Sequence, residues 1–264
     1  MRNASVFKGK TFVLKLSGKV LADSSLLASV CTDLVCLQRA GVKTVVVHGG
    51  GRQIDLEAER LGLPKKVVNG LRYTDEKVLA VVERVLSQLN AGIVSCLESR
   101  GGKAVGLNVG KRFVVKARKR GELGFVGAVS SVDSKALRHW FSLDVVPVIS
   151  CLARGRSACL NVNADDVAVE VALAVNADRL VFVSDVPGIL GRKENASSLI
   201  PVVSVRDLKG MVKEGLVSGG MVPKALACVK AANAHLALIQ VIGSENHSIL
   251  DSLLAPSAGT KVVK

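Results

Sequence analysis

The chain alternates between two patterns of apolar residues. The runs TFVLKL (11–16) and VKTVVVHG (42–49) are short, continuous and rich in β-branched side chains, which predicts buried strands. Residues 23–41 instead place apolar side chains at helical spacing, with Asp23 and the serine beside it as candidate N-caps and Gly41 as the stop. The first part of the chain therefore predicts a strand, a helix and a second strand.

The same alternation continues toward the C-terminus. We expect further helices at 52–61, 75–97, 133–143, 165–176, 204–215 and 221–235. We expect further strands at 104–107, 112–117, 124–130, 145–150, 179–186 and 236–243. Alternating strands and helices predict an α/β fold, a three-layer αβα sandwich around a mainly parallel central sheet.

The composition is that of a globular protein. The chain has 264 residues, of which 49% are hydrophobic and 22% charged, enough for a substantial core and against disorder. The apolar runs stay well below the roughly 18 residues that a spanning helix needs. Lys15 follows the basic first ten residues before any long apolar region develops. We therefore expect a cytoplasmic protein with no membrane segment and no secretory signal.

The net charge indicates an anionic ligand. It is +14, from 36 basic and 22 acidic residues, while aromatic residues make up only 3% of the chain. Bases would find few stacking partners, and no helix-turn-helix or zinc-finger pattern is present. We therefore expect small anionic substrates and no nucleic acid. The densest basic run, KARKR at 116–120, predicts a solvated hairpin tip.

The cysteines and histidines predict no reactive or metal-binding cluster. The cysteines at 31, 36, 96, 151, 159 and 228 include no C-x-x-C pair, and the four histidines are dispersed. We expect reduced, mostly buried thiols, no metal held by protein side chains and no Cys/His nucleophile.

Glycine-containing turns follow the first two strands. Ligands of parallel sheets bind beyond the carboxyl ends of the strands, and here those ends read KLSGK and HGGGRQ. Consecutive glycines let backbone N–H groups approach anionic oxygens, and a helix beginning near Arg52 adds the positive end of its dipole. These turns predict a cradle for phosphate or another anion.

Two common nucleotide motifs do not explain these turns. GKT at 9–11 is not a P-loop, because Ala4 replaces the first glycine and the motif precedes the first strand. A dinucleotide fingerprint beginning at Gly49 would need a glycine where Ile54 stands. A glycine triplet alone is also compatible with a purely steric turn.

Five motifs in combination are more specific. They are VVVHGGGRQI (45–54), NGLRYTDE (69–76), NVNADDVA (161–168), VSDVPGIL (183–190) and GGMVPK (219–224). Their order and spacing resemble the amino acid kinase family, and within it the acetylglutamate kinases, over nearly the whole chain. The resemblance implies two closely joined lobes. Residues 1–177 would bind the amino acid and form a dimer interface, and residues 178–264 would bind ATP.

The resemblance implies phosphorylation of the side-chain carboxylate of N-acetylglutamate by ATP, the second step of arginine synthesis, with Mg²⁺ bound through the nucleotide phosphates. Phosphoryl transfer needs alignment and neutralisation of charge. By resemblance, Lys15 lies near the transferring phosphoryl group and Lys224 on the ATP side, while Asp165 stays ionised between them. A solvated side chain is the alternative for each lysine.

The binding residues are also implied by the resemblance. Arg72 would grip the α-carboxylate of the substrate, a task suited to the guanidinium fork, and a surface arginine is its alternative. Asn161 would hydrogen-bond the same carboxylate or the amide, and Gly50 and Gly51 would contact substrate and γ-phosphate through their backbone. The segment KKVVNGL before Arg72 resembles a flexible hairpin that covers the amino-acid pocket.

The nucleotide pocket is implied in two segments of the second lobe and one turn of the first. Asp185 would contact ribose or adenine, whereas Pro187 and Gly188 are as compatible with a simple turn. The full set is Gly18, Ser184, Asp185, Val186, Pro187, Gly188, Ile189, Leu190, Leu216, Val217 and Ser218.

The polar cluster at 161–166 also has a purely structural interpretation. It predicts a helix N-terminus, with Asn163 or Asp165 as the cap and Asp166 favouring the helix dipole. A helix start at the substrate crevice can serve both purposes. Asp166 is assigned to the helix alone.

The chain departs from the family pattern in two places. Ser17 stands where acetylglutamate kinases usually carry the first of two glycines, and residues 106–120 are more basic than the glycine-rich family version. The alternatives are a carrier-protein-linked aminoadipate or glutamate kinase, which would suit the positive charge, and a silent anion-binding regulatory homologue. The NGLR motif favours a free amino acid, and Lys15, Lys224 and Asp165 argue against silence.

The resemblance also bears on assembly. Arginine-inhibited members carry an additional N-terminal helix that joins dimers into a hexamer, and MRNASVFKGK is too short and too broken by Gly9 for such a helix. We expect a homodimer that arginine does not inhibit.

Overall fold

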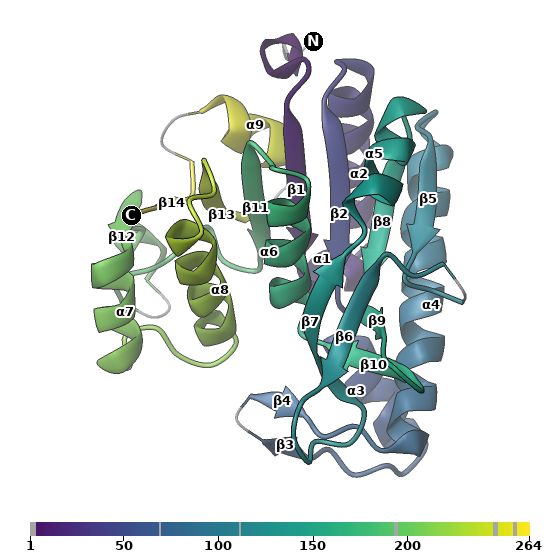
Figure 1. The fold of residues 1–264 in the computed structure, drawn as a ribbon. Helices are drawn as coiled ribbons and strands as arrows, with labels where there is room; N and C mark the ends of the chain where they lie inside the picture. Colours follow the sequence, from purple (N-terminus) through teal and green to yellow (C-terminus); the bar gives the residue numbers. More distant parts are fainter. Residues whose placement is uncertain (1–3, 69, 111, 193–194, 245–247, 256–257) are drawn as a thin grey trace.

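The computed structural model describes residues 4–68, 70–110, 112–192, 195–244, 248–255 and 258–264 (Figure 1). The helices are α1 (Gly18–Ala22), α2 (Ser24–Arg39), α3 (Gly51–Arg60), α4 (Glu76–Glu98), α5 (Ser134–Ser142), α6 (Ala164–Ala174), α7 (Val205–Lys213), α8 (Met221–Asn233) and α9 (Ser248–Leu254). The strands are β1 (Thr11–Leu16), β2 (Lys43–His48), β3 (Val67–Val68), β4 (Leu71–Arg72), β5 (Ala104–Leu107), β6 (Val115–Lys119), β7 (Val126–Val132), β8 (Val146–Ser150), β9 (Leu152–Arg154), β10 (Cys159–Val162), β11 (Arg179–Ser184), β12 (Val202–Ser204), β13 (Ile239–Gly243) and β14 (Thr260–Val263).

One central sheet organises the molecule. Its eight strands run in the order β12-β14-β13-β11-β1-β2-β8-β5. All neighbouring pairs are parallel except β13 with β14. Helices cover both faces, with α6 and α8 on one side and α2 on the other (Figure 1). The predicted three-layer αβα sandwich with a mainly parallel sheet is confirmed.

The alternation of side chains along β1 decides which residue faces which layer. Phe12 and Leu14 are buried in the cluster that contains α2, whereas Val13 is buried in the cluster that contains α6. Side chains two positions apart share a face of a strand, so Lys15 projects on the side of Val13 and α6. The polar N-terminus of α6 is therefore within reach of this lysine.

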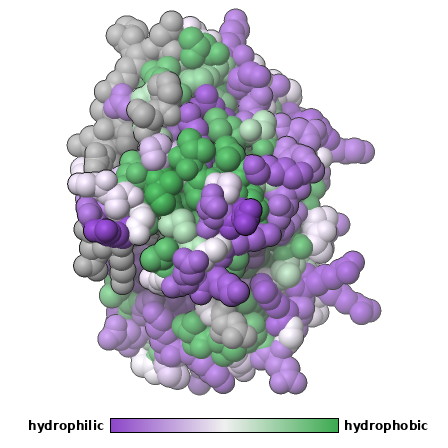
Figure 2. All heavy atoms as spheres, turned by 90° about the vertical axis from the view of Figure 1, so that its left-hand side faces the viewer, coloured by the Kyte–Doolittle hydropathy of each residue, from purple (hydrophilic) through white to green (hydrophobic). Residues whose placement is uncertain are grey.

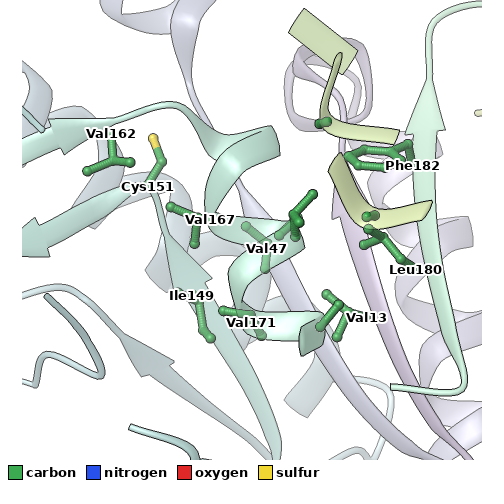
Figure 3. Packing of buried hydrophobic residues seen from close by; sticks show 14 of the residues in the cluster. Val13, Val47, Ile149, Cys151, Val162, Val167, Val171, Leu180 and Phe182 are labelled. Carbon is green, nitrogen blue, oxygen red and sulfur yellow. The ribbon is translucent and has the colours of Figure 1, made fainter. Parts of the chain in front are cut away.

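The core beneath α6 is built from branched aliphatic side chains. Val167 and Val171 of α6 lie over Val13 of β1 and Val47 of β2, and Phe182 of β11 closes the same layer (Figure 3). All five side chains are fully buried. Burying such side chains contributes roughly 1.5–3 kcal/mol each, which fixes α6 on the sheet.

Helix α4 is apolar and long enough by composition to cross a membrane. In the fold it is a core helix: Val82 and Leu86 pack in one hydrophobic cluster, and Ile93 and Leu97 pack in the other. Its hydropathy is explained by burial against the sheet and α2.

A smaller closed sheet, β10-β7-β6-β9, packs beside the main one. Part of the basic run 116–120 lies in β6 and not in the turn, which corrects the predicted hairpin tip. Lys116 and Arg118 are exposed because alternate positions of this strand, Val115 and Ala117, face the core, and Lys119 is exposed at the end of the strand.

Several short elements were absent from the sequence-based expectations. They are α1, β9, β10, β12, α9 and β14. Ser17 explains the first of them, because its Oγ accepts a hydrogen bond from the Val20 N–H and caps α1. The hairpin expected before Arg72 is present as β3 and β4, while Asn69 lies outside the described residues.

Candidate active site

The carboxyl ends of β1 and β2 open into a cavity of about 500 Å³. This is the edge of a parallel sheet where a ligand is expected. The cavity is lined by residues that the sequence had singled out, together with several others. The former are Lys15, Gly18, Gly50, Gly51, Arg72, Asn161 and Asp165.

A buried carboxylate joins two lysines at the inner end of this cavity. Asp165 Oδ1 lies 2.8 Å from Lys15 Nζ and 3.6 Å from Lys224 Nζ. The ammonium of Lys224 also lies 4.9 Å from the centre of the Phe182 ring. Both contacts are ion pairs. The fold thus brings Lys15 next to Asp165 and Lys224, which follow it by 150 or more positions in the sequence.

Burial and mutual charge set the ionisation of this cluster. Burial alone would raise the pKa of Asp165, but the charges of Lys15 and Lys224 outweigh burial and hold that pKa below its usual value. Burial and repulsion from Lys15 lower the pKa of Lys224 to about 8, although Asp165 opposes both. At pH 7 the cluster thus carries two cations around one anion, a net positive charge facing the cavity.

The N-terminus of α6 positions Asp165. Asn163 is the N-cap, and its Oδ1 accepts hydrogen bonds from the backbone N–H groups of Asp165 and Asp166. Of the two predicted cap candidates, Asn163 is therefore the cap and Asp165 is not. Asp166 experiences Lys230 and Arg120 rather than the lysine pair. The same first turn thus aims one carboxylate at the cavity and the other away from it.

The glycine turn after β2 packs closely against α4. A Cβ on Gly50 would lie 2.8 Å from Leu89 Cδ1 and 3.0 Å from Leu86 Cδ2, so a larger residue would have to displace these leucine side chains. Gly51 begins α3, so its amide lies at the positive end of that helix dipole. Anionic oxygens can therefore approach the backbone of this turn closely.

At the outer end of the cavity, Arg72 meets a carboxylate. Its Nη2 donates to Asp55 Oδ1 and, at 3.3 Å, to the carbonyl oxygen of Gly51. Lys65 Nζ lies 2.8 Å from the other oxygen of Asp55. Among the described residues, Nε and Nη1 of Arg72 have no acceptor. Two donor groups of the guanidinium therefore remain for a ligand carboxylate.

Asn161 lies on β10 between the two ends of the cavity. Its Nδ2 donates to Thr74 Oγ1 at 3.2 Å, and the side chain lines the cavity. That contact fixes the direction of the amide, so its remaining hydrogen-bonding capacity faces the cavity.

A second hollow of about 250 Å³ lies in the C-terminal part of the chain. Its lining is mostly apolar: Val186, Gly188, Ile189, Leu190, Leu216, Val217, Ser218 and Met221. Figure 2 views the molecule from the side of α7 and β12 and shows apolar side chains gathered in the middle of this face. A flat apolar ring such as a nucleobase suits such a lining.

The residues expected to bind nucleotide are not all brought together. Ser184, Asp185 and Pro187 do not line the second hollow, whereas the other expected residues of this lobe do. A Cβ on Gly188 would lie 2.6 Å from both Leu199 Cδ1 and Thr260 Oγ1, so close packing requires this glycine.

Sequence reasoning missed several residues that line the two cavities. Met221 lines the apolar hollow, and it stands inside the GGMVPK motif, which was its available signal. Asp55 and Lys65 line the main cavity. Asp55 follows Gly51 by one helical turn, a spacing that places both on the same side of α3. Lys65 lies in a connecting segment and gave no signal.

The sequence matches the model of the amino acid kinase family over residues 10–242. It is 36% identical over 263 residues to the chloroplastic acetylglutamate kinase of Arabidopsis thaliana, an alignment that covers 97% of this chain and 76% of the relative. It is 37% identical over 275 residues to the acetylglutamate kinase of Heliobacterium modesticaldum, covering 98% of this chain and 93% of the relative.

Solved structures share the fold. The N-acetylglutamate synthase of Neisseria gonorrhoeae in complex with coenzyme A and N-acetyl-glutamate superposes with a TM-score of 0.88 at 20% identity, covering 99% of this chain and 61% of that chain. The carbamate kinase of Giardia lamblia bound to AMP-PNP superposes with a TM-score of 0.72 at 14% identity, covering 97% of this chain and 99% of that chain. With the family model matched over most of its length, and with the five motifs converging on one sheet edge, this chain is a member of the amino acid kinase family.

Proposed function

We propose that this protein transfers the γ-phosphoryl group of ATP to the side-chain carboxylate of N-acetyl-L-glutamate, which gives N-acetylglutamyl 5-phosphate in arginine biosynthesis. The acetylglutamate kinases to which it is 36–37% identical support this substrate. These relatives do not favour the carrier-linked kinase or the silent homologue.

The observation that supports the proposal most strongly is the ion-paired cluster of Lys15, Asp165 and Lys224 at the inner end of the cavity. Phosphoryl transfer builds negative charge on the oxygens of the moving group, and fixed cations stabilise that charge. Asp165 holds both ammonium groups on one carboxylate oxygen, so neither lysine needs to reorganise when the charge develops.

The two lysines would stabilise negative charge on different oxygens of the reacting groups. Lys15 comes from β1 in the first lobe and would neutralise the group in transit between carboxylate and nucleotide. Lys224 comes from α8 in the second lobe and would bear on the phosphate oxygens of ATP. Backbone N–H groups of Gly50 and Gly51 would add donors on the acceptor side.

The substrate would lie between the lysine cluster and Arg72. The free donors of Arg72 would bind the α-carboxylate, and Asn161 would bind the amide or the same carboxylate. The cavity holds the cations Lys15, Lys65 and Arg72 against the carboxylates of Asp55 and Asp165, with Lys224 just behind. This excess of positive charge suits a dianionic amino acid.

The nucleotide would occupy the second lobe, residues 178–264. The apolar hollow around Leu216 and Met221 would take the base. Among the described residues, no three His, Cys, Asp or Glu side chains are placed to hold a metal ion. The carboxylates nearest the site are already paired with lysine or arginine, so Mg²⁺ would enter on the nucleotide phosphates and supply further charge neutralisation there.

We also propose a cytoplasmic homodimer assembled through the first lobe, residues 1–177. Two hollows, of about 560 and 370 Å³, lie beside the exposed side of α4, and Arg84 contributes to both. Apolar side chains such as Leu56 and Phe113 line them. A second copy related by twofold symmetry would fill these hollows. Light scattering that gives a monomer or a hexamer would refute this assembly.

A phosphotransfer assay tests the reaction. Purified protein is incubated with Mg²⁺ and ATP and with N-acetylglutamate, glutamate, UMP or a carrier-linked amino acid, and ADP is measured by chromatography. We expect ADP release that depends on N-acetylglutamate. Preference for another acceptor, or no turnover with any, would overturn the proposal.

A further inference from the structure

A buried histidine lies directly behind the glycine turn. His48 ends β2 and is fully buried, and Asn90 of α4 beside it is 1% exposed. His48 Nδ1 lies 3.0 Å from the carbonyl oxygen of Gly49, and its Nε2 lies 3.0 Å from Asn90 Nδ2. Asn90 Nδ2 also donates to the carbonyl oxygen of Val148 at 2.9 Å.

This network allows only one tautomer. The amide nitrogen of Asn90 has two N–H groups, and one of them is used on the Val148 carbonyl, which can only accept. The other points at His48 Nε2, so Nε2 accepts and carries no proton. Nδ1 therefore carries the hydrogen and donates it to the Gly49 oxygen. Burial lowers the pKa of His48 to about 4, so the ring is neutral at pH 7.

The hydrogen bond to Gly49 fixes the direction of the next amide. In a trans peptide the C=O and N–H groups point in opposite directions, and this structure has no cis peptide bond among its described residues. Because the Gly49 oxygen faces the His48 ring in the interior, the N–H of Gly50 faces away from it. Gly49, Gly50 and Gly51 line the cavity. Among the described residues, the Gly50 N–H has no acceptor.

The space around Asn90 is also built for this contact. A Cβ on Gly106 of β5 would lie 2.2 Å from Asn90 Oδ1, so this strand position admits only glycine next to the amide. Among the described residues, no side chain of the Lys15–Asp165–Lys224 cluster and no side chain of Arg72 is hydrogen-bonded to His48 or Asn90.

We infer that His48 and Asn90 are positioning residues for phosphoryl transfer: together they lock the peptide between Gly49 and Gly50 so that the Gly50 N–H is preoriented toward the anionic oxygens of the reacting group. This inference rests on the proposed function for the identity of that anion. A donor aimed before the reaction begins requires no reorganisation in the transition state, and loss of one such donor costs about 10²–10³ in kcat.

Two substitutions at His48 distinguish the role of Nδ1 from the role of Nε2. The amide of His48→Asn places an N–H near the position of Nδ1, so it can still donate to Gly49. The longer His48→Gln reaches the position of Nε2, so it can meet Asn90 but no longer donates to Gly49. His139, exposed on α5, supplies the control His139→Gln.

The expected result is a loss in kcat with unchanged binding. His48→Gln should lower kcat by about a hundredfold while the KM values for ATP and N-acetylglutamate change less than threefold, and His48→Asn should recover most of that loss. Melting temperatures are measured for all variants. Equal loss in both His48 variants, in proportion to their loss of folded protein, would mean that His48 only fills the core and would overturn the inference.

A measurement on the wild-type protein makes the test independent of folding and of the reaction. Selective ¹⁵N labelling of histidine reports the tautomer of each ring by NMR. We expect His48 in the Nδ1–H form at pH 7, and the Nε2–H form or the imidazolium would refute the inference. The wild-type turnover assay reports separately on the proposed function, so the two can fail independently.

Discussion

Replacing Asp165 by asparagine removes the one anion between two buried ammonium groups and leaves the shape of the side chain unchanged. Lys224 then keeps its burial and its repulsion from Lys15, both of which lower its pKa, and loses the charge that opposes them. We therefore expect Asp165→Asn to convert Lys224 into a neutral amine at pH 7 before ATP binds, and to lower kcat/KM for ATP at least about a hundredfold.

The magnitude follows from the geometry of the cluster. Opposite unit charges 3.6 Å apart attract by about 4–5 kcal/mol at an effective dielectric constant of about 20, which corresponds to roughly 3 pKa units. The pKa of Lys224, about 8 in the native protein, would then fall to about 5 in the variant. At pH 7 only about 1% of the variant would carry the ammonium. Bound phosphates would raise both values, so the comparison uses kcat/KM for ATP, which reports ionisations of the enzyme before ATP binds.

The assay is the pH dependence of kcat/KM for ATP with saturating N-acetylglutamate, measured from pH 5 to pH 9 as ADP by chromatography. A lysine is active when protonated, so activity declines as the pH rises through its pKa. The decline should begin in the native protein above about pH 8 and in the variant roughly 3 pH units lower.

Asp166→Asn is the matched control, because it makes the same change one residue along the first turn of α6 and away from the lysines. We expect its kcat/KM for ATP to stay within about threefold of the native value. If Asp165→Asn folds, shows the native pH profile and stays within tenfold of the native kcat/KM for ATP at pH 7, then Asp165 does not control Lys224 and the reasoning fails.

Three further outcomes are expected. Arg72→Ala should raise the KM for N-acetylglutamate by tenfold or more while the KM for ATP changes less than twofold, since the free donors of Arg72 are available for the substrate carboxylate. A selective loss of ATP affinity would show that Arg72 does not bind the amino acid. Met221→Glu puts a charge in the apolar hollow and should raise the Kd for ATP, measured by calorimetry, at least tenfold. An unchanged Kd would show that the base does not bind in this hollow. The pKa of His48 is about 4 in the folded protein and 6.5 in the unfolded chain. Its contribution to the free energy of unfolding is therefore intact above pH 6.5 and is lost as the pH falls toward 4. Urea unfolding should show about 3 kcal/mol less stability at pH 4 than at pH 6.5 from this residue, a decrement that His48→Asn should lack.

The elements with strong periodicity were predictable from sequence alone. Buried strands such as β1 and β2 and the long helix α4 have apolar patterns that no other element explains. The short strand β10 was missed because it has only four residues and an asparagine in its middle. β14 was missed because it has only four residues, too few for a pattern to be recognised.

The site was predictable only in part for the same reason. The pattern along β1 places Lys15 on one face, but its ion pair with Asp165 spans the whole first lobe, and only the resemblance of the motifs brought the two together. The pairing of Arg72 with Asp55 and the contact of His48 with Asn90 depend on how α3 and α4 pack, which no local pattern encodes. The roles assigned to these residues stay predictions until the variants are measured.

The central sheet runs without interruption across the boundary proposed between the two lobes. β1 pairs with β2 on one side and with β11 on the other, in a register that sets Lys15 against Phe182. Separating the two lobes between β1 and β11 would break these backbone hydrogen bonds. Each buried polar group left without a partner would cost about 1–3 kcal/mol. We therefore expect reactants to enter and leave through movement of short segments at the rim, such as the β3–β4 hairpin and the turn before α8. β1, which carries Lys15, is hydrogen-bonded on both sides, so we expect the bound phosphoryl donor and acceptor to be aligned relative to this one strand.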